Sequence, residues 1–131
     1  MTDRPHEPVQ PVQPVEPVVL ERTTTPRGEL VLRRVGEHLE VVSNGVFLMD
    51  TRDGRSERLL VRAALDVHPD PRRLLIGGLG VGFSLVEAVA EPALTAIDVV
   101  EIEPDLVGWH ATHLGHLTGA ALADPRVRVV V

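Results

Sequence analysis

Glycines are concentrated in one short stretch of the chain, Gly77-Gly78-Leu79-Gly80-Val81-Gly82, which directly follows an apolar run at residues 74–76. Because glycine has no Cβ, the backbone can turn sharply there and a ligand can approach it closely. A helical pattern begins at Phe83, and the first turn of a helix has N–H groups without intrahelical partners. This succession of strand, glycine-rich turn and helix predicts a site for a nucleotide-type ligand.

An acidic residue follows the next predicted strand at the spacing that a ribose site requires. The β-branched run at residues 96–100 predicts that strand. Glu101 ends it about 20 residues past the loop, where a carboxylate can accept hydrogen bonds from both ribose hydroxyls. We therefore predict that Gly78, Gly80, Gly82 and Glu101 contact the ligand. A strand–helix–strand unit without a ligand is the alternative.

The glycine spacing separates two kinds of nucleotide site. The dinucleotide pattern is G-x-G-x-x-G, whereas Gly78, Gly80 and Gly82 follow G-x-G-x-G and Phe83 stands in place of the third glycine. This spacing is nearer to the loop that holds S-adenosylmethionine-type ligands in methyltransferase-like folds. Glycine clusters also form plain turns, so the loop alone does not identify the ligand.

Composition limits the classes of protein that the chain can represent. With 131 residues and 44% hydrophobic residues, one modest domain with a core is expected. Aromatic residues make up only 2%, which leaves no stacking platform for single-stranded nucleic acid, and the net charge of −6 argues against a nucleic-acid partner. The absence of cysteine excludes disulfides, thiolate catalysis and Cys-ligated zinc.

The N-terminal residues carry no targeting pattern. No apolar signal region follows Met1, and no apolar run approaches the ~18 residues of a membrane span, so we expect a cytoplasmic protein.

Prolines recur every third residue from Pro5 to Pro17, which matches the period of polyproline II. Residues 1–27 are predicted to form a disordered, Pro-rich tail, with a ligand for a proline-binding module as the alternative.

A small β-meander with one helix is predicted at residues 28–68. Asn44-Gly45 between two apolar runs is a strong hairpin signal. We predict strands at 29–34, 38–43 and 46–50, then a helix that Ser56 caps and that runs to about residue 67. Pro69 and Pro71 mark the joint to a Rossmann-like part at 69–131.

The Rossmann-like part is predicted to continue with a helix at 83–91, the strand at 96–100, a helix from Pro104 to the glycines at 115–119, and a strand at 125–131. His110, His113 and His116 fan over about 120° of the second helix. Without cysteines or an i, i+4 histidine pair, we expect solvated imidazoles on a partly buried face rather than a metal site.

Three short motifs are the most specific in the chain: L-I-G-G at 75–78, V-E-I-E-P-D at 100–105 and D-P-R-V at 124–127. With these motifs the chain resembles the spermidine synthase (polyamine aminopropyltransferase) family from about Glu29 to Val131. The resemblance implies an enzyme of polyamine biosynthesis, a transferase with a small N-terminal β domain and a Rossmann-like domain. It further implies that Glu101 holds the donor ribose and that Gly78, Gly80 and Gly82 line the donor's loop.

The resemblance also implies the reaction and the partners. Such enzymes transfer an aminopropyl group from decarboxylated S-adenosylmethionine to a diamine, so a small-molecule donor and an amine acceptor are expected. Nucleic acid, a membrane and a metal are not expected, and a homo-oligomer is an open possibility. The fold class is α/β, with an antiparallel β-meander followed by the first half of a Rossmann-like domain of the S-adenosylmethionine-dependent methyltransferase type.

The chain departs from the family at three places. The family's loop usually reads G-G-G-D-G-G, and its Asp helps to hold the donor's amine, whereas residues 77–82 contain no acid. The family's D-E-x-x-Y-H-E helix offers Tyr and His to the substrate, but Leu60 and Val61 stand there. The family's catalytic and adenine-binding Asp residues follow later strands, so no catalytic residue is assigned here. A methyltransferase that uses S-adenosylmethionine itself is the alternative reaction.

The number of predicted parallel strands suggests a third possibility. A doubly wound sheet has the order 3-2-1-4-5, and the chain supplies only strands 1 to 3. We therefore expect a chain truncated within the Rossmann-like domain and inactive alone, or one that another chain completes. Because an open strand edge invites pairing, a non-catalytic nucleotide-binding or dimerisation module is the remaining alternative.

Overall fold

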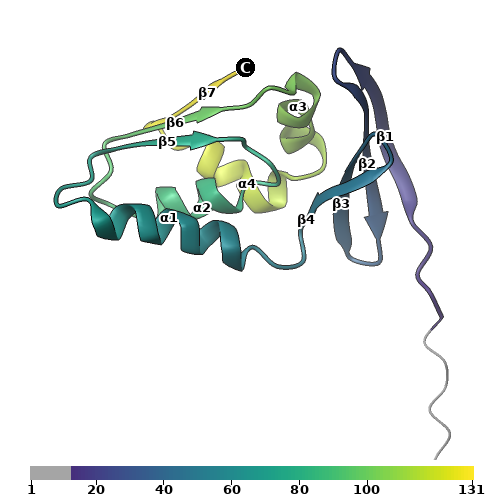
Figure 1. Ribbon diagram of the computed structural model, residues 1–131, viewed down its shortest axis with the longest axis horizontal. Coiled ribbons are helices and arrows are strands. Elements are labelled where there is room, and N and C mark those ends of the chain that lie inside the picture. The colour runs from purple at the N-terminus through teal and green to yellow at the C-terminus, as the bar shows by residue number, and fades with distance from the viewer. Residues whose placement is uncertain (1–12) are drawn as a thin grey trace, which may run out of the picture.

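The computed structural model describes residues 13–131, which form two sheets (Figure 1). The first is antiparallel, in the order β1 (Val18–Thr25), β2 (Gly28–Val35), β3 (His38–Ser43) and β4 (Val46–Asp50). The second is parallel, in the order β5 (Arg73–Gly77), β6 (Ala96–Val100) and β7 (Val127–Val130). Four helices accompany them: α1 (Arg55–Val67), α2 (Phe83–Val89), α3 (Pro104–Thr112) and α4 (Gly115–Leu122). The predicted α/β fold class is confirmed.

The antiparallel sheet contains one strand that the sequence did not predict. Residues 18–25 form β1, which pairs with β2 from Val18↔Arg34 to Thr25↔Gly28, so the expected disorder up to residue 27 is wrong for this segment. The third-residue proline repeat stops at Pro17, and the following β-branched residues suit a strand that pairs along β2. Residues 1–12, which hold the start of the repeat, lie outside the described part of the chain.

The hairpin between β3 and β4 forms where it was predicted. Asn44 and Gly45 both adopt positive φ angles, 50° and 78°, as a two-residue turn with the twist of a hairpin requires. The Asn44 side chain also accepts a hydrogen bond from the Glu29 N–H at 2.9 Å. The turn therefore fixes the register of β3 and β4 and also joins them to β2.

Helix α1 begins differently from the prediction, because Ser56 does not cap it. The N-cap is Gly54, where a Cβ would lie only 2.2 Å from the Phe83 ring. The Asp53 carboxylate accepts the Arg55 N–H at 2.9 Å, while the Ser56 hydroxyl, inside the first turn, donates to Glu57. Close packing of the helix start against Phe83 thus decides where α1 begins.

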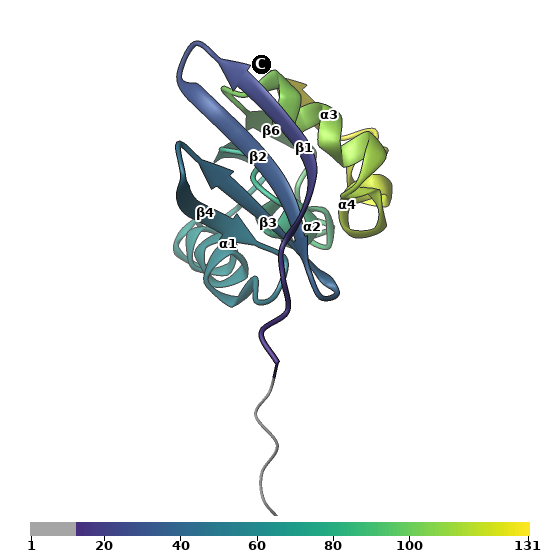
Figure 2. The same cartoon turned by 90° about the vertical axis from the view of Figure 1, so that its right-hand side faces the viewer.

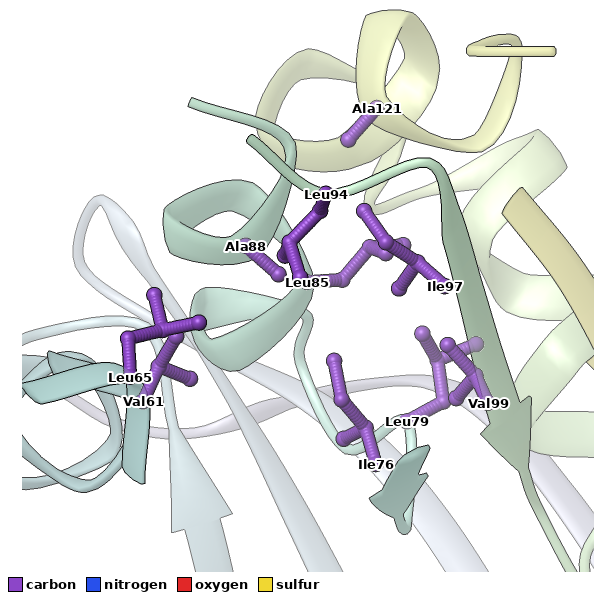
Figure 3. Packing of buried hydrophobic residues seen from close by; sticks show 10 residues of the cluster. All are labelled: Val61, Leu65, Ile76, Leu79, Leu85, Ala88, Leu94, Ile97, Val99 and Ala121. Carbon is purple, nitrogen blue, oxygen red and sulfur yellow. The ribbon is translucent and has the colours of Figure 1, made fainter. Parts of the chain in front are cut away.

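The parallel sheet is covered on one face by α1, α2 and α4 (Figure 1). Figure 3 shows the aliphatic cluster between this face and the helices, which agrees with the aliphatic core expected from composition. Strand β5 pairs only with β6 among the described residues, and its Leu75 side chain is 69% exposed. The sheet therefore has an open edge at β5.

The predicted helix from Pro104 is broken into α3 and α4 at residues 113–114. A Cβ at Gly115 would lie 3.1 Å from the His110 carbonyl oxygen, so the chain passes very close to the end of α3 there. The buried Leu114 side chain anchors the break in the second core cluster, which joins α3 to the antiparallel sheet. Packing across this cluster therefore overrides the continuous helical pattern.

The D-P-R-V motif at 124–127 has a structural role. The Arg126 guanidinium donates to the carbonyl oxygens of Val89, Glu91 and Leu94 at 2.7–3.1 Å. The Asp124 carboxylate accepts from the same guanidinium, whose hydrogen bonds lower the pKa of Asp124 to about 2. Arg126 thus satisfies the carbonyl groups at the end of α2 and in the loop before β6.

Candidate nucleotide-binding site

A cavity of about 580 Å³ lies where the two sheets meet. In Figure 1 the antiparallel sheet stands opposite the ends to which β5 and β6 point, and Figure 2 shows it in front of β6. This carboxyl edge is where open α/β sheets bind ligands. All four predicted contact residues line the cavity. Its lining comes from the antiparallel sheet, the start of α1, the glycine loop and the β6–α3 junction: Arg27, Leu30, Ser43, Leu48, Met49, Glu57, Leu60, residues 77–84, Glu101, Ile102, Glu103 and Leu106.

Glycine is required at the loop positions for different structural reasons. Gly78, Gly80 and Gly82 have φ angles of 95°, 55° and 100°, a region that favours glycine. A Cβ at Gly78 would meet nothing within 4 Å, whereas a Cβ at Gly82 would lie 2.0 Å from Thr118 Cγ2. Gly78 therefore leaves open space that a ligand can approach, and Gly82 permits close packing of α2 on α4.

Glu101 organises the glycine loop. Its side chain is only 5% exposed. Oε2 accepts the N–H groups of Leu79 at 2.8 Å and Gly80 at 3.4 Å, and Oε1 accepts the Glu103 N–H at 2.9 Å. A carboxylate has about four acceptor positions, so it can still accept from a ligand hydroxyl. A contact between Glu101 and a ribose stays a prediction. The hydrogen bonds by which Glu101 links the loop to the end of β6 are present in the structure.

Arg27 lines the cavity beside the β6–α3 junction. It lies in the turn between β1 and β2, and its guanidinium forms an ion pair with Glu103 and donates to the Ile102 carbonyl at 2.8 Å. The hydrogen bonds from Arg27 lower the pKa of the Glu103 carboxyl below its usual value. Arg27 is not among the predicted site residues, because it stands in the predicted tail and no local pattern connects it with residue 103.

His110 supports the loop from α3, and this corrects the expectation of a solvated imidazole. Its side chain is 2% exposed, Nε2 lies 2.8 Å from the Gly80 carbonyl oxygen, and Nδ1 lies 2.6 Å from the Thr118 hydroxyl. Because a carbonyl oxygen only accepts, Nε2 carries a hydrogen. In the neutral imidazole Nδ1 then accepts from the Thr118 hydroxyl, which gives up its longer, 3.2 Å hydrogen bond to the Leu114 carbonyl oxygen. His113 contacts Glu21 near the surface, and residues 13–131 contain no cluster of side chains suited to a metal.

The burial of His110 predicts a pH dependence of stability. Burial lowers the pKa of this imidazole, while the Gly80 carbonyl and the Glu101 charge oppose the shift. Below pH of about 6.5 the unfolded chain therefore binds a proton that the folded chain does not, so stability falls as the pH decreases, by at most about 1.4 kcal/mol per pH unit. Urea unfolding between pH 7.5 and 5.5 should show a steeper loss for the wild type than for His110→Gln. The exposed His116→Gln should behave as the wild type; equal slopes for the wild type and His110→Gln would contradict the prediction.

Three features define a methyltransferase-like α/β fold: the glycine loop, the acid after β6, and the parallel sheet that helices α1, α2 and α4 cover on one face. The solved spermidine synthase from Thermotoga maritima has this fold; it superposes with a TM-score of 0.76 at 17% sequence identity, over 86% of this chain and 39% of that protein. No protein-family model matches the chain.

Sequence relatives agree with this class. The chain is 39% identical over 72 residues to polyamine aminopropyltransferase 2 of Caldanaerobacter subterraneus, which covers 55% of the chain and 23% of that protein. It is 30% identical over 115 residues to polyamine aminopropyltransferase 2 of Ralstonia nicotianae, which covers 86% of the chain and 22% of that protein. The predicted resemblance to the spermidine synthase family is thus confirmed, and the chain spans less than a quarter of the length of these curated relatives.

A second type of enzyme is also similar to the chain. Putrescine N-methyltransferase 3 of Nicotiana tabacum is 36% identical over 73 residues, which cover 56% of the chain and 19% of that protein.

None of the helices within residues 13–131 has the length and apolar character to cross a membrane.

Proposed function

We propose that the chain forms the donor-binding part of a spermidine synthase-like transferase and binds an S-adenosylmethionine-type donor. The observation that carries the proposal is the cavity at the carboxyl edge of β5 and β6, in which Glu101 lies against a loop of positive-φ glycines. Glu101 accepts from a ribose hydroxyl, and the open space at Gly78 admits the ligand close to the backbone. The sequence relatives make decarboxylated S-adenosylmethionine the first candidate donor.

The proposed reaction is an aminopropyl transfer to an amine. The nitrogen of the acceptor attacks the carbon next to the donor sulfonium, the carbon–sulfur bond breaks, and the sulfur leaves as a neutral thioether. The attacking nitrogen loses one proton, which a carboxylate base takes up. Binding aligns the two reactants for this displacement. We assign no catalytic base among the described residues and propose that this chain alone binds the donor without turnover.

Calorimetric titration tests donor binding. The wild-type chain is expected to bind methylthioadenosine, S-adenosylmethionine and decarboxylated S-adenosylmethionine. Glu101→Gln should weaken all three by about tenfold, because the amide nitrogen that replaces one carboxylate oxygen cannot accept a hydrogen bond from a ribose hydroxyl. The amide oxygen still accepts from the loop, so the variant is expected to remain folded. A folded wild-type chain that binds none of the three nucleosides would contradict the proposal.

A methyltransferase that uses S-adenosylmethionine is the second candidate, and the structure of the loop favours it. None of residues 77–82 is acidic, and Met49 of β4 occupies the space beside Gly80, where a Cβ would lie 3.2 Å from its sulfur. The similarity to a putrescine N-methyltransferase is consistent with this alternative. The same titration discriminates, since tighter binding of S-adenosylmethionine than of its decarboxylated form would favour methyl transfer.

A further inference from the structure

Three carboxylates line the cavity, and only one of them lacks strong partners. The Glu103 carboxylate pairs with Arg27, and Glu101 accepts three backbone N–H groups. The Glu57 side chain, by contrast, accepts from the described residues only the hydroxyl of the neighbouring Ser56, at 2.9 Å. Within residues 13–131 no arginine or histidine lies at ion-pair distance from Glu57. Glu57 is therefore an uncompensated negative charge on the cavity wall.

Glu57 lies on the β5 side of the cavity, away from the β6–α3 junction. Helix α1 presents it from its first turn, next to Leu60. The Ser84 hydroxyl, in the first turn of α2, lies 3.5 Å from the Glu57 carbonyl oxygen. The first turns of α1 and α2 thus meet directly after the glycine loop, and this contact holds Glu57 beside the loop.

The two sides of the cavity differ in chemistry. Ile102 follows Glu101 on the β6 side, where its side chain is 64% exposed, and Leu106 lies near it on α3. Arg27 on this side is neutralised by Glu103. The β6 side therefore offers an apolar surface that suits a flat base, whereas the β5 side offers the free carboxylate of Glu57. A ribose at Glu101 would stand between them.

We propose that Glu57 binds the cationic tail of a nucleoside sulfonium donor. The inference rests on the proposed function, because it takes Glu101 as the ribose contact. The base then lies against Ile102, and the sulfonium with its attached amine points toward Glu57. The loop itself supplies no counterion, since Leu79 and Val81 are buried and Met49 occupies the space at Gly80. Glu57 supplies from α1 the negative charge that the loop lacks.

A structural role for Glu57 must be separated from ligand binding. An acidic residue in the first turn of a helix interacts favourably with the helix dipole. That interaction would affect the stability of α1 but not the preference among ligands of different charge. The decisive readout is therefore the ratio of affinities for a charged and an uncharged nucleoside, measured on the same folded variant.

The test compares decarboxylated S-adenosylmethionine, which carries a sulfonium and an ammonium group, with the uncharged methylthioadenosine. Calorimetric titration of Glu57→Gln should show about tenfold weaker binding of the cationic donor and unchanged binding of methylthioadenosine. Asp66→Asn removes the same charge from the other end of α1, outside the cavity lining, and should leave both affinities unchanged.

The outcomes separate this inference from the proposed function. If wild type and Glu57→Gln bind the cationic donor equally well, or if Glu57→Gln weakens both nucleosides to the same extent, the role of Glu57 as counterion is wrong while the nucleoside site stands. If the folded wild-type chain binds neither nucleoside, the proposed function fails and the counterion role fails with it. A loss confined to the cationic donor supports the inference.

Discussion

Replacing Gly82 by alanine is expected to lower the free energy of unfolding by about 3 kcal/mol. Gly82 has a φ angle of 100°, which an L-residue adopts only with strain. The added Cβ would also lie 2.0 Å from Thr118 Cγ2, and Thr118 is fully buried in α4. Neither atom can move away without displacing α2 from α4. Urea denaturation measures the loss.

Two further variants divide this effect into its causes. Gly78→Ala has a similar φ angle, 95°, but its Cβ meets nothing within 4 Å, so it should cost only about 1–2 kcal/mol of backbone strain. Thr118→Ser removes Cγ2 and keeps the hydroxyl that His110 contacts, so adding it to Gly82→Ala should recover part of the loss. Equal costs for the alanines at 78 and 82 would contradict the steric explanation.

Glu101→Ala is the second substitution with a large expected effect, a loss of about 3 kcal/mol in the free energy of unfolding. It leaves the N–H groups of Leu79, Gly80 and Glu103 without their common acceptor. The hydrogen bonds from the Leu79 and Glu103 N–H groups are buried, so the cost of an unmade hydrogen bond is highest at these two groups. Urea denaturation of the variant and the wild type measures the difference.

Hydrogen exchange locates the same effect in the loop. In Glu101→Ala the Leu79 amide should exchange much faster, whereas the Ile97 amide, which donates to the Arg126 carbonyl in the parallel sheet, should change only with global stability. Glu101→Gln keeps one acceptor oxygen and should cost about 1 kcal/mol. A loop amide that remains protected in Glu101→Ala would show that Glu101 does not hold the loop.

The comparison of these two variants matters for function. Glu101 both organises the loop and is the proposed ribose contact, so Glu101→Ala would lose binding even if the carboxylate never touched a ligand. Glu101→Gln retains part of the loop contact and is therefore the more informative variant for binding. If its affinity falls while the exchange of the Leu79 amide is unchanged, the loss belongs to the ligand contact.

Much of the local structure was predictable from the sequence because its causes are local. The strands at residues 38–43, 46–50 and 96–100 have the predicted bounds, since β-branched runs bounded by turn residues determine them. The Asn44-Gly45 turn and the start of α3 at Pro104 follow from the backbone preferences of single residues. The glycine loop and Glu101 were also predicted to lie together, because strand, turn and strand succeed one another at a known spacing.

Other elements depend on contacts that no local pattern announces. Strand β1 forms because its residues pair with β2, and strand pairing depends on the partner as much as on the residues themselves. The predicted single helix divides into α3 and α4 because Leu114 packs into the core shared with the antiparallel sheet. In both cases tertiary contacts outweigh the preference of the isolated segment.

Local sequence patterns and composition suffice to predict the α/β class, the glycine loop, the acid that follows β6 and the aliphatic character of the core. The folded structure sets what these residues contact. It directs Glu101 toward the loop amides, buries His110 against Gly80, and brings Arg27 to Glu103 and Glu57 to the cavity wall. The physical reason is that these contacts join segments distant in the chain, and their geometry is set by packing between the two sheets rather than by the preferences of neighbouring residues.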